Sequence, residues 1–258
     1  MSESSSECLN PGGALLPFFG RYDAAHRARY EFATRFFSDG LCVDFGCGYG
    51  FGTDLIASSA PNTVIGLDVD RRCISYASKR FRANNLRFQL TNSIDIPLAD
   101  KSVGLITCFE VIEHLRLDQI RGFFAEARRV LTPTGLVIGS TPNALLRHHA
   151  DLVYHIQEFA PNELHELASE SGFEVELRCQ GDGAGHISST FERILETLPT
   201  SAKRSRTLKV FQSLYYATLG ASKESHSEAT RIRDGPIEQA SDIIFTLRPP
   251  KSPEKPGL

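Results

Sequence analysis

The 258-residue sequence lacks several features that would each point to a particular kind of protein. It has no C-x-x-C pair, no apolar run long enough to span a bilayer, and no signal-peptide pattern in residues 1–10. Its net charge of −3 gives no general attraction to nucleic acid. We therefore expect a cytoplasmic protein with no transmembrane segment and no nucleic-acid partner.

The sequence also has no need of disulfide bonds. Hydrophobic residues make up 41% of the chain, which is enough for a full core. Three of the six cysteines, Cys42, Cys108 and Cys179, fall inside predicted apolar strands, where cysteine acts as a small hydrophobic residue. This usage suits a reducing compartment. The length allows one globular domain with additional segments.

A glycine loop follows the first predicted strand, in the stretch Val-Asp-Phe-Gly-Cys-Gly-Tyr-Gly-Phe-Gly-Thr. The dinucleotide fingerprint needs glycine at the first, third and sixth positions, and no frame here supplies it. A dehydrogenase is therefore the least favoured interpretation. Gly46, Gly48 and Gly50 still allow a nucleotide-like ligand to lie against the backbone, because they carry no Cβ atom.

Asp44 stands at the carboxyl end of that apolar strand. A buried carboxylate is unfavourable unless a cation or hydrogen-bond donors accompany it. An ammonium group on the ligand would be such a partner, whereas a pyrophosphate would be repelled. The loop therefore predicts S-adenosylmethionine (SAM) as the cofactor.

Strands and helices alternate along most of the chain, which predicts βαβ units and a mostly parallel sheet with helices on both faces. The expected helices cover residues 24–37, 52–59, 71–83, 118–131 and 161–171. The expected strands cover residues 41–45, 63–67, 86–90, 103–109, 135–141, 174–179 and 242–247. The fold class is α/β, Rossmann-like.

The domain limits follow from changes in composition. Residues 1–12 are rich in Ser, Glu and Gly and are expected to be disordered, and residues 13–247 form the domain. Residues 181–238 interrupt the alternation with two predicted helices, 188–196 and 203–219, and form a helical insertion or lid before the last strand. Residues 248–258 form a flexible tail.

Two further positions lie where strands end. Asp68 closes the second strand, where an acid can accept hydrogen bonds from both ribose hydroxyls of an adenosine. The structural alternative is an ordinary helix N-cap. Asn92 and Ser93 close the third strand, where they could contact an adenine edge, although turn formation alone also explains an Asn-Ser pair.

These motifs resemble those of class I SAM-dependent methyltransferases, in order, over about residues 20–180 and 242–247. The further matching stretches are Gly-Leu-Asp-Val-Asp, Phe-Glu-Val-Ile-Glu-His-Leu and Arg-Arg-Val-Leu-Thr-Pro-Thr-Gly-Leu-Val-Ile-Gly-Ser-Thr-Pro-Asn. The resemblance implies a seven-stranded sheet with its last strand antiparallel. It also implies that Asp44 and the glycines border the methionine part of SAM, Asp68 the ribose and Ser93 the adenine. The chain departs from the family pattern at two places. Asn92 stands where the family often has Asp, and Val103-Gly104 stands where the family often has Phe-Asp.

Three ionisable residues follow the fourth strand, where open α/β sheets bind ligands. If this segment is helical, Glu110 and His114 share a face and Glu113 flanks it. His114 could act as a general base toward an alcohol or phenol, assisted by Glu113. The alternative is structural pairing beside the cofactor, with Glu110 lining the cofactor pocket.

A narrower resemblance concerns Glu-x-x-Glu-His and the later His155 segment, which are similar to the metal-binding pattern of small-RNA 2′-O-methyltransferases. Matched residue by residue, it would make Glu110, Glu113, His114 and His155 ligands of a divalent metal. Glycan-associated methyltransferases show the same segments, and carboxylate–histidine pairs also occur without metal. A metal is therefore not the favoured interpretation.

The preferred function is SAM-dependent O-methylation of a small-molecule or sugar-containing (glycan) acceptor, a substrate class that rests on the resemblance alone. The alternatives are a metal-dependent RNA 2′-O-methyltransferase and a non-catalytic adaptor that keeps the fold. The basic and aromatic segment 203–219 could contact a membrane surface peripherally, but packing on its own domain is preferred. His148 and His149 are expected to be solvated loop residues. The sequence does not indicate an oligomeric state.

Overall fold

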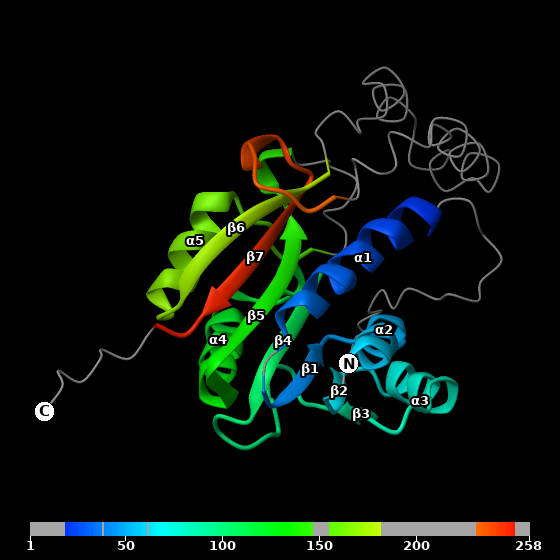
Figure 1. Cartoon of the computed structure of the whole chain (residues 1–258). Helices are drawn as coiled ribbons and strands as arrows, with labels where there is room; N and C mark the ends of the chain where they lie inside the picture. The colour runs from blue at the N-terminus through cyan, green and yellow to red at the C-terminus, as the bar shows by residue number, and fades with distance from the viewer. Residues whose placement is uncertain (1–18, 38, 61, 147–154, 182–230, 251–258) are drawn as a thin grey trace, which may run out of the picture.

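The structure is a computed structural model that describes residues 19–37, 39–60, 62–146, 155–181 and 231–250 (Figure 1). Its helices are α1 (Phe19–Ala33), α2 (Phe51–Ser59), α3 (Arg71–Arg80), α4 (Leu117–Val130) and α5 (Pro161–Glu170). Its strands are β1 (Leu41–Phe45), β2 (Val64–Asp68), β3 (Leu86–Leu90), β4 (Val103–Phe109), β5 (Leu131–Pro142), β6 (Glu174–Gln180) and β7 (Asp242–Arg248). Short 3₁₀ turns are η1 (Thr34–Phe36), η2 (Ile112–His114), η3 (Ala144–Leu146) and η5 (Ile237–Gln239).

The seven strands form one sheet in the order β3-β2-β1-β4-β5-β7-β6. The pairs from β3 through β5 are parallel, and β7 runs antiparallel to both of its neighbours. This confirms the predicted α/β Rossmann-like class and the antiparallel last strand. Because the strand order reverses between β1 and β4, the carboxyl ends of these two strands flank the crevice where such sheets bind ligands.

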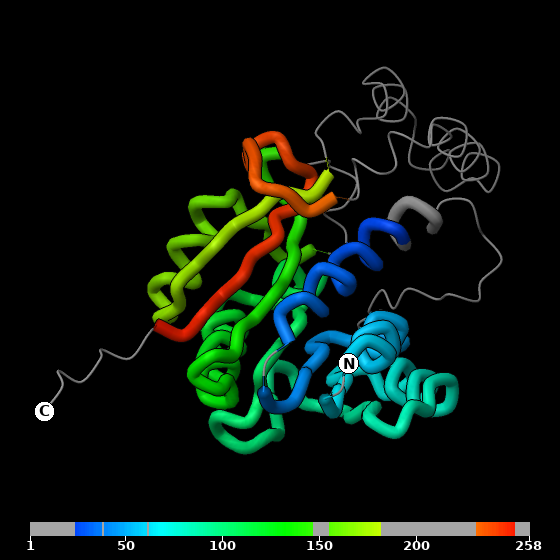
Figure 2. The backbone as a smooth tube through the Cα atoms, in the orientation of Figure 1, coloured from blue at the N-terminus to red at the C-terminus, as the bar shows by residue number. Residues whose placement is uncertain are grey.

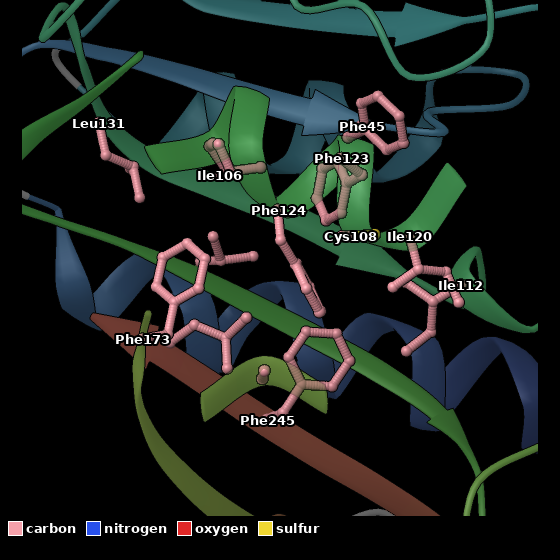
Figure 3. Packing of buried hydrophobic residues seen from close by; sticks show 14 of the residues in the cluster. Phe45, Ile106, Cys108, Ile112, Ile120, Phe123, Phe124, Leu131, Phe173 and Phe245 are labelled. Carbon is pink, nitrogen blue, oxygen red and sulfur yellow. The ribbon is translucent and has the colours of Figure 1, made fainter. Parts of the chain in front are cut away.

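Helices cover both faces of the sheet. One core packs α4 and α5 against β4, β5 and β7, with Phe123, Phe124, Phe173 and Phe245 among its aromatic side chains (Figure 3). The second core lies under α1 and α2, where Tyr30, Ala33 and Ile56 contact the opposite face. All seven residues of β4 are buried, as expected for a central parallel strand covered on both sides.

Several predicted boundaries were wrong by a few residues. α1 begins at Phe19 rather than at residue 24, and α3 ends at Arg80 because Phe81 is already extended (φ −116°, ψ 126°). β5 begins at Leu131, immediately after α4, because Leu131 is extended and pairs with Val103 of β4. β7 includes Arg248, which the sequence assigned to the tail.

Other predictions concern residues outside the described part of the chain. These are the disordered N-terminus at 1–12, the helices at 188–196 and 203–219, His148 and His149, and the tail from residue 251. Within the described residues, no helix has the length and apolar character needed to cross a membrane.

Helix α1 precedes the sheet in sequence and lies on one face beside α2 and β4 (Figure 2). A buried hydrogen-bond network at Asp44 of β1 fastens it there. The Asp44 carboxylate accepts hydrogen bonds from Thr53 Oγ1 at 2.6 Å, from Thr107 Oγ1 at 2.7 Å, and from the Tyr30 hydroxyl of α1 at 3.2 Å. Three elements, α1, α2 and β4, therefore meet on one carboxylate.

The free energy of unfolding should depend on pH because the Asp44 carboxyl of this network titrates. Burial raises the pKa of the Asp44 carboxyl from its ordinary 3.8 to about 6, although the Thr53, Thr107 and Tyr30 hydrogen bonds act in the opposite direction. A raised pKa in the folded state means that the stability contribution of Asp44 is complete below about pH 4 and is lost as the pH rises through about 6. We expect the free energy of unfolding of the wild type, relative to Asp44→Asn, to fall by about 3 kcal/mol between about pH 4 and pH 8.

Urea unfolding of both proteins across this pH range measures the difference. Asp39→Asn is the matched control, because Asp39 is exposed and should give a wild-type-minus-variant difference that changes little with pH. A flat difference for Asp44→Asn, or one that rises with pH, would contradict the assignment.

Candidate functional site

The three loop glycines all have positive φ angles but serve different purposes. A Cβ atom on Gly46 would lie 2.4 Å from Cγ2 of Val111, and one on Gly50 would lie 2.6 Å from Cε1 of Phe88. These two glycines therefore allow close packing of the loop. A Cβ atom on Gly48 would meet no atom within 4 Å, so the space beside Gly48 is open to a ligand.

Asp68 lies next to this open space. Its carboxylate accepts hydrogen bonds from the backbone N–H of Gly48 and from that of Asp70, both at 2.8 Å. Burial raises the pKa of Asp68, and the backbone donors partly offset that effect. The N-cap of α3 is Asp70, whose side chain accepts from Arg72 N at 2.7 Å, so the N-cap alternative for Asp68 was wrong.

Asp44 is fully buried, and the hydroxyl groups of Tyr30, Thr53 and Thr107 are its hydrogen-bond donors. The sequence argument that this acid needs a cationic ligand therefore does not hold, because the protein itself supplies the donors. A role in cofactor binding stays a prediction for Asp44.

Asn92 and Ser93 are both exposed at the end of β3, on the ligand-binding edge of the sheet. Ser93 has a φ of 51°, and its hydroxyl accepts a hydrogen bond from Gln119 Nε2 at 3.0 Å. Gln119 lies in the first turn of α4, so this bond connects the loop after β3 to the helix after β4.

Glu110 is the first residue after β4 and is not helical, so the predicted sharing of a helix face with His114 was wrong. Its φ of 56° is left-handed, a conformation that costs a residue with a side chain on the order of 1–3 kcal/mol. Ser140 of β5 holds it on two sides, since Glu110 N donates to Ser140 O at 3.1 Å and Ser140 Oγ donates to Glu110 Oε1 at 2.6 Å. Arg29 Nη1 lies 2.7 Å from the same carboxylate oxygen.

Three predicted residues come together beyond Glu110. Ligand atoms of Glu113, His114 and His155 all lie within 4.8 Å of one another, and the two imidazole rings are 5.2 Å apart. Glu113 is fully buried; Oε2 accepts from Thr141 at 3.2 Å, while Oε1 has no hydrogen-bond partner among the residues that the structure describes. Burial and the Glu110 carboxylate raise the pKa of Glu113 well above its ordinary value. Glu110 does not join this group.

His155 is held in place from two directions. Its Nδ1 lies 2.9 Å from Oε1 of Glu158, whose side chain is only 4% exposed. The backbone N–H of Ile156 donates to the carbonyl oxygen of Glu113 at 2.8 Å. With Nδ1 engaged by a carboxylate, Nε2 is the ring nitrogen left for a metal or a proton.

The sequence analysis missed the residues that support these acids. They are Tyr30, Thr53 and Thr107 around Asp44, and Arg29, Ser140 and Asp242 around Glu110. The available signal was the position of Arg29 four residues before Ala33, on the side of α1 that faces the sheet.

Comparisons with known proteins agree with this geometry. A family model described as a methyltransferase domain matches residues 43–139. A "Probable S-adenosylmethionine-dependent methyltransferase" of Mycolicibacterium smegmatis is 40% identical over 138 residues, 52% of each chain. An O-methyltransferase of Aspergillus sclerotiorum is 30% identical over 52% of this chain and 54% of that protein. The small RNA 2′-O-methyltransferase of Arabidopsis thaliana is 30% identical over 54% of this chain but only 17% of its own length.

The chain spans about half the length of the first relatives that it matches. Among solved structures, a SAM-dependent methyltransferase from Archaeoglobus fulgidus has a TM-score of 0.57 at 17% identity, covering 88% of this chain and 93% of that one. That likeness concerns the fold. Together with the glycine loop, the acid that closes β2 and the strand order, these matches show that the chain is similar to SAM-dependent methyltransferases over residues 43–139 and shares the fold of solved SAM-dependent methyltransferases.

Proposed function

We propose that this protein transfers a methyl group from SAM to an oxygen atom of a small-molecule or sugar-containing acceptor. The observation that carries the proposal is the grouping of Glu113, His114 and His155 one turn beyond the end of β4. A hydroxyl acceptor must lose a proton on methylation, and an imidazole is the side chain best suited to accept it near neutral pH. The O-methyltransferase relative supports the choice of oxygen.

The cofactor pocket is assigned to the crevice between β1 and β4. Asp68 would hold the ribose, since its carboxylate is fixed by two backbone N–H groups and has further lone pairs. Gly46, Gly48 and Gly50 would let the backbone approach the ligand, with Asp44 and Glu110 on the methionine side and Asn92 and Ser93 at the adenine. When bound, SAM supplies a methyl group activated by the positive charge on its sulfur.

His114 is our candidate for the general base. It is exposed at the end of η2, so an acceptor can reach it, and it directly follows the buried Glu113. The chain's part in the reaction would be to hold the acceptor hydroxyl in line with the methyl group and to accept its proton. The ring of His155, held by Glu158, would form the neighbouring wall.

Cofactor binding gives the first test. Isothermal titration calorimetry should show micromolar binding of SAM to the wild type, and Asp68→Ala should weaken that binding by about a hundredfold or more, because two ribose hydrogen bonds to a charged group are lost. Asp70→Asn is the matched control: Asp70 is two residues away but caps α3, so its replacement should leave the affinity nearly unchanged.

Wild-type protein that binds no SAM would contradict the proposal and favour the non-catalytic adaptor. Equal losses in the two variants would show that Asp68 acts through the local fold and not on the ribose.

A second candidate function is metal-dependent 2′-O-methylation of RNA. It is favoured by the buried oxygen Oε1 of Glu113, which has no partner within the described part of the chain and lies with His114 and His155 in a set of mixed ligands that suits a divalent cation. The Arabidopsis relative carries the corresponding name. Glu113, His114 and His155 would hold the ion, which would polarise the acceptor hydroxyl. Glu110 lies outside this group, and Oε1 of its carboxylate contacts Arg29 and Ser140.

Metal analysis distinguishes the two functions. If this site holds an ion, protein dialysed against Mn²⁺ or Zn²⁺ should retain about one ion per chain by mass spectrometry, and Glu113→Ala should retain far less, since the buried ligand is removed. His165→Ala is the control, because His165 is exposed on α5 and outside the group. No retained metal and no RNA affinity at low salt would rule out this second function.

A further inference from the structure

One buried arginine of α1 reaches the ligand-binding edge of the sheet. The side chain of Arg29 is only 3% exposed. Its Nη1 lies 2.7 Å from Glu110 Oε1 and donates to Ser140 Oγ at 3.0 Å. Its Nη2 lies 3.2 Å from Asp242 Oδ1, and its Nε donates to Gln180 Oε1 at 2.6 Å. One guanidinium therefore contacts residues at the same edge of β4, β5, β6 and β7.

Glu110 is the member of this network that borders the cofactor crevice. The next residue, Val111, packs directly on Gly46 of the glycine loop, as the 2.4 Å approach to a Cβ atom there shows. Oε1 of Glu110 contacts both Arg29 Nη1 and Ser140 Oγ, and 15% of the Glu110 side chain is exposed. The protein thus fixes one oxygen of a carboxylate whose side chain is partly exposed.

Arg29 lies between two acids, Glu110 and Asp242, whose pKa values shift in opposite directions. Burial raises the pKa of Glu110, but Arg29 and the Ser140 hydroxyl together hold it below its ordinary value. Burial raises the pKa of Asp242 in spite of the same arginine. The other ionisable groups near Glu110 are His26 of α1, Cys108 of β4, Glu113 and His155.

We propose that Arg29 is a positioning residue for the SAM-dependent reaction: it fixes the Glu110 carboxylate beside the glycine loop, where that carboxylate binds the positively charged methionine portion of SAM. The inference rests on the proposed function and adds to it a residue from outside the alternating strands and helices. A charged group near the sulfonium and ammonium is expected to favour SAM binding only if it is held in place and ionised.

A double-mutant cycle tests whether Arg29 acts through Glu110. SAM affinity is measured by calorimetry for the wild type, Arg29→Met, Glu110→Gln and the double variant. We expect each single change to weaken binding by about tenfold, the loss typical of a hydrogen bond to a charged group, and the double variant to bind no more weakly than Glu110→Gln alone. Arg27→Met is the control, because Arg27 lies on the exposed side of α1 and, among the residues that the structure describes, forms an ion pair only with Glu31, at 2.9 Å. The Arg27→Met variant should bind SAM as tightly as the wild type does.

Removing a buried cation could unfold the protein, so Ser140→Ala provides a second route. This change deletes one donor to Glu110 without leaving an unpaired charge. Its loss of SAM affinity should be smaller than that of Arg29→Met, and it should also vanish when Glu110 is already replaced by Gln. Additive losses, no loss for Arg29→Met, or an equal loss for Arg27→Met would overturn the proposal. Failure of the proposed function is distinct, because it appears as absent SAM binding in the wild type itself.

Discussion

Two adjacent residues of α1 each contact an acid at or just beyond the end of a central strand, and the site depends on this pair of contacts. Tyr30 donates to Asp44 of β1, and Arg29 contacts Glu110 after β4. β1 and β4 are neighbours at the point where the strand order reverses, so the helix fixes both walls of the crevice at once. Burying two acids without such partners would cost several kcal/mol each, on the order expected for unpaired buried charges.

The two glutamates after β4 are only three residues apart, yet their surroundings drive their proton affinities in opposite directions. Arg29 and Ser140 hold the pKa of Glu110 below its ordinary value, whereas burial and the Glu110 carboxylate raise the pKa of Glu113 in spite of its hydrogen bond from Thr141. Pairs of acids separated in this way commonly mark a division of roles in an active site. Here the ionised acid directly precedes Val111, which packs on Gly46 of the glycine loop, and the other lies with the imidazoles of His114 and His155.

Sequence reasoning located the strands, the glycine loop and the acids because each depends on local pattern: runs of apolar residues, missing Cβ atoms, and the residue that closes a strand. It could not find what surrounds the acids, since Arg29 contacts Ser140 and Asp242 from distant parts of the chain. Asp44 shows the limit most clearly. Its burial was correctly inferred, but its partners are hydroxyls from α1, α2 and β4, which no spacing rule connects. The helical geometry assumed for Glu110 failed because Ser140 holds that residue in a left-handed turn.

The antiparallel course of β7 has a consequence for the connection between β6 and β7. Gln180 ends β6 and pairs with Asp242, the first residue of β7, so the chain between them leaves and re-enters the sheet at neighbouring points on the ligand-binding edge. With both ends anchored, doubling the length of the connection would add only about 0.6 kcal/mol of closure entropy. The length of this connection can therefore change at small cost in free energy while β6 and β7 keep their register.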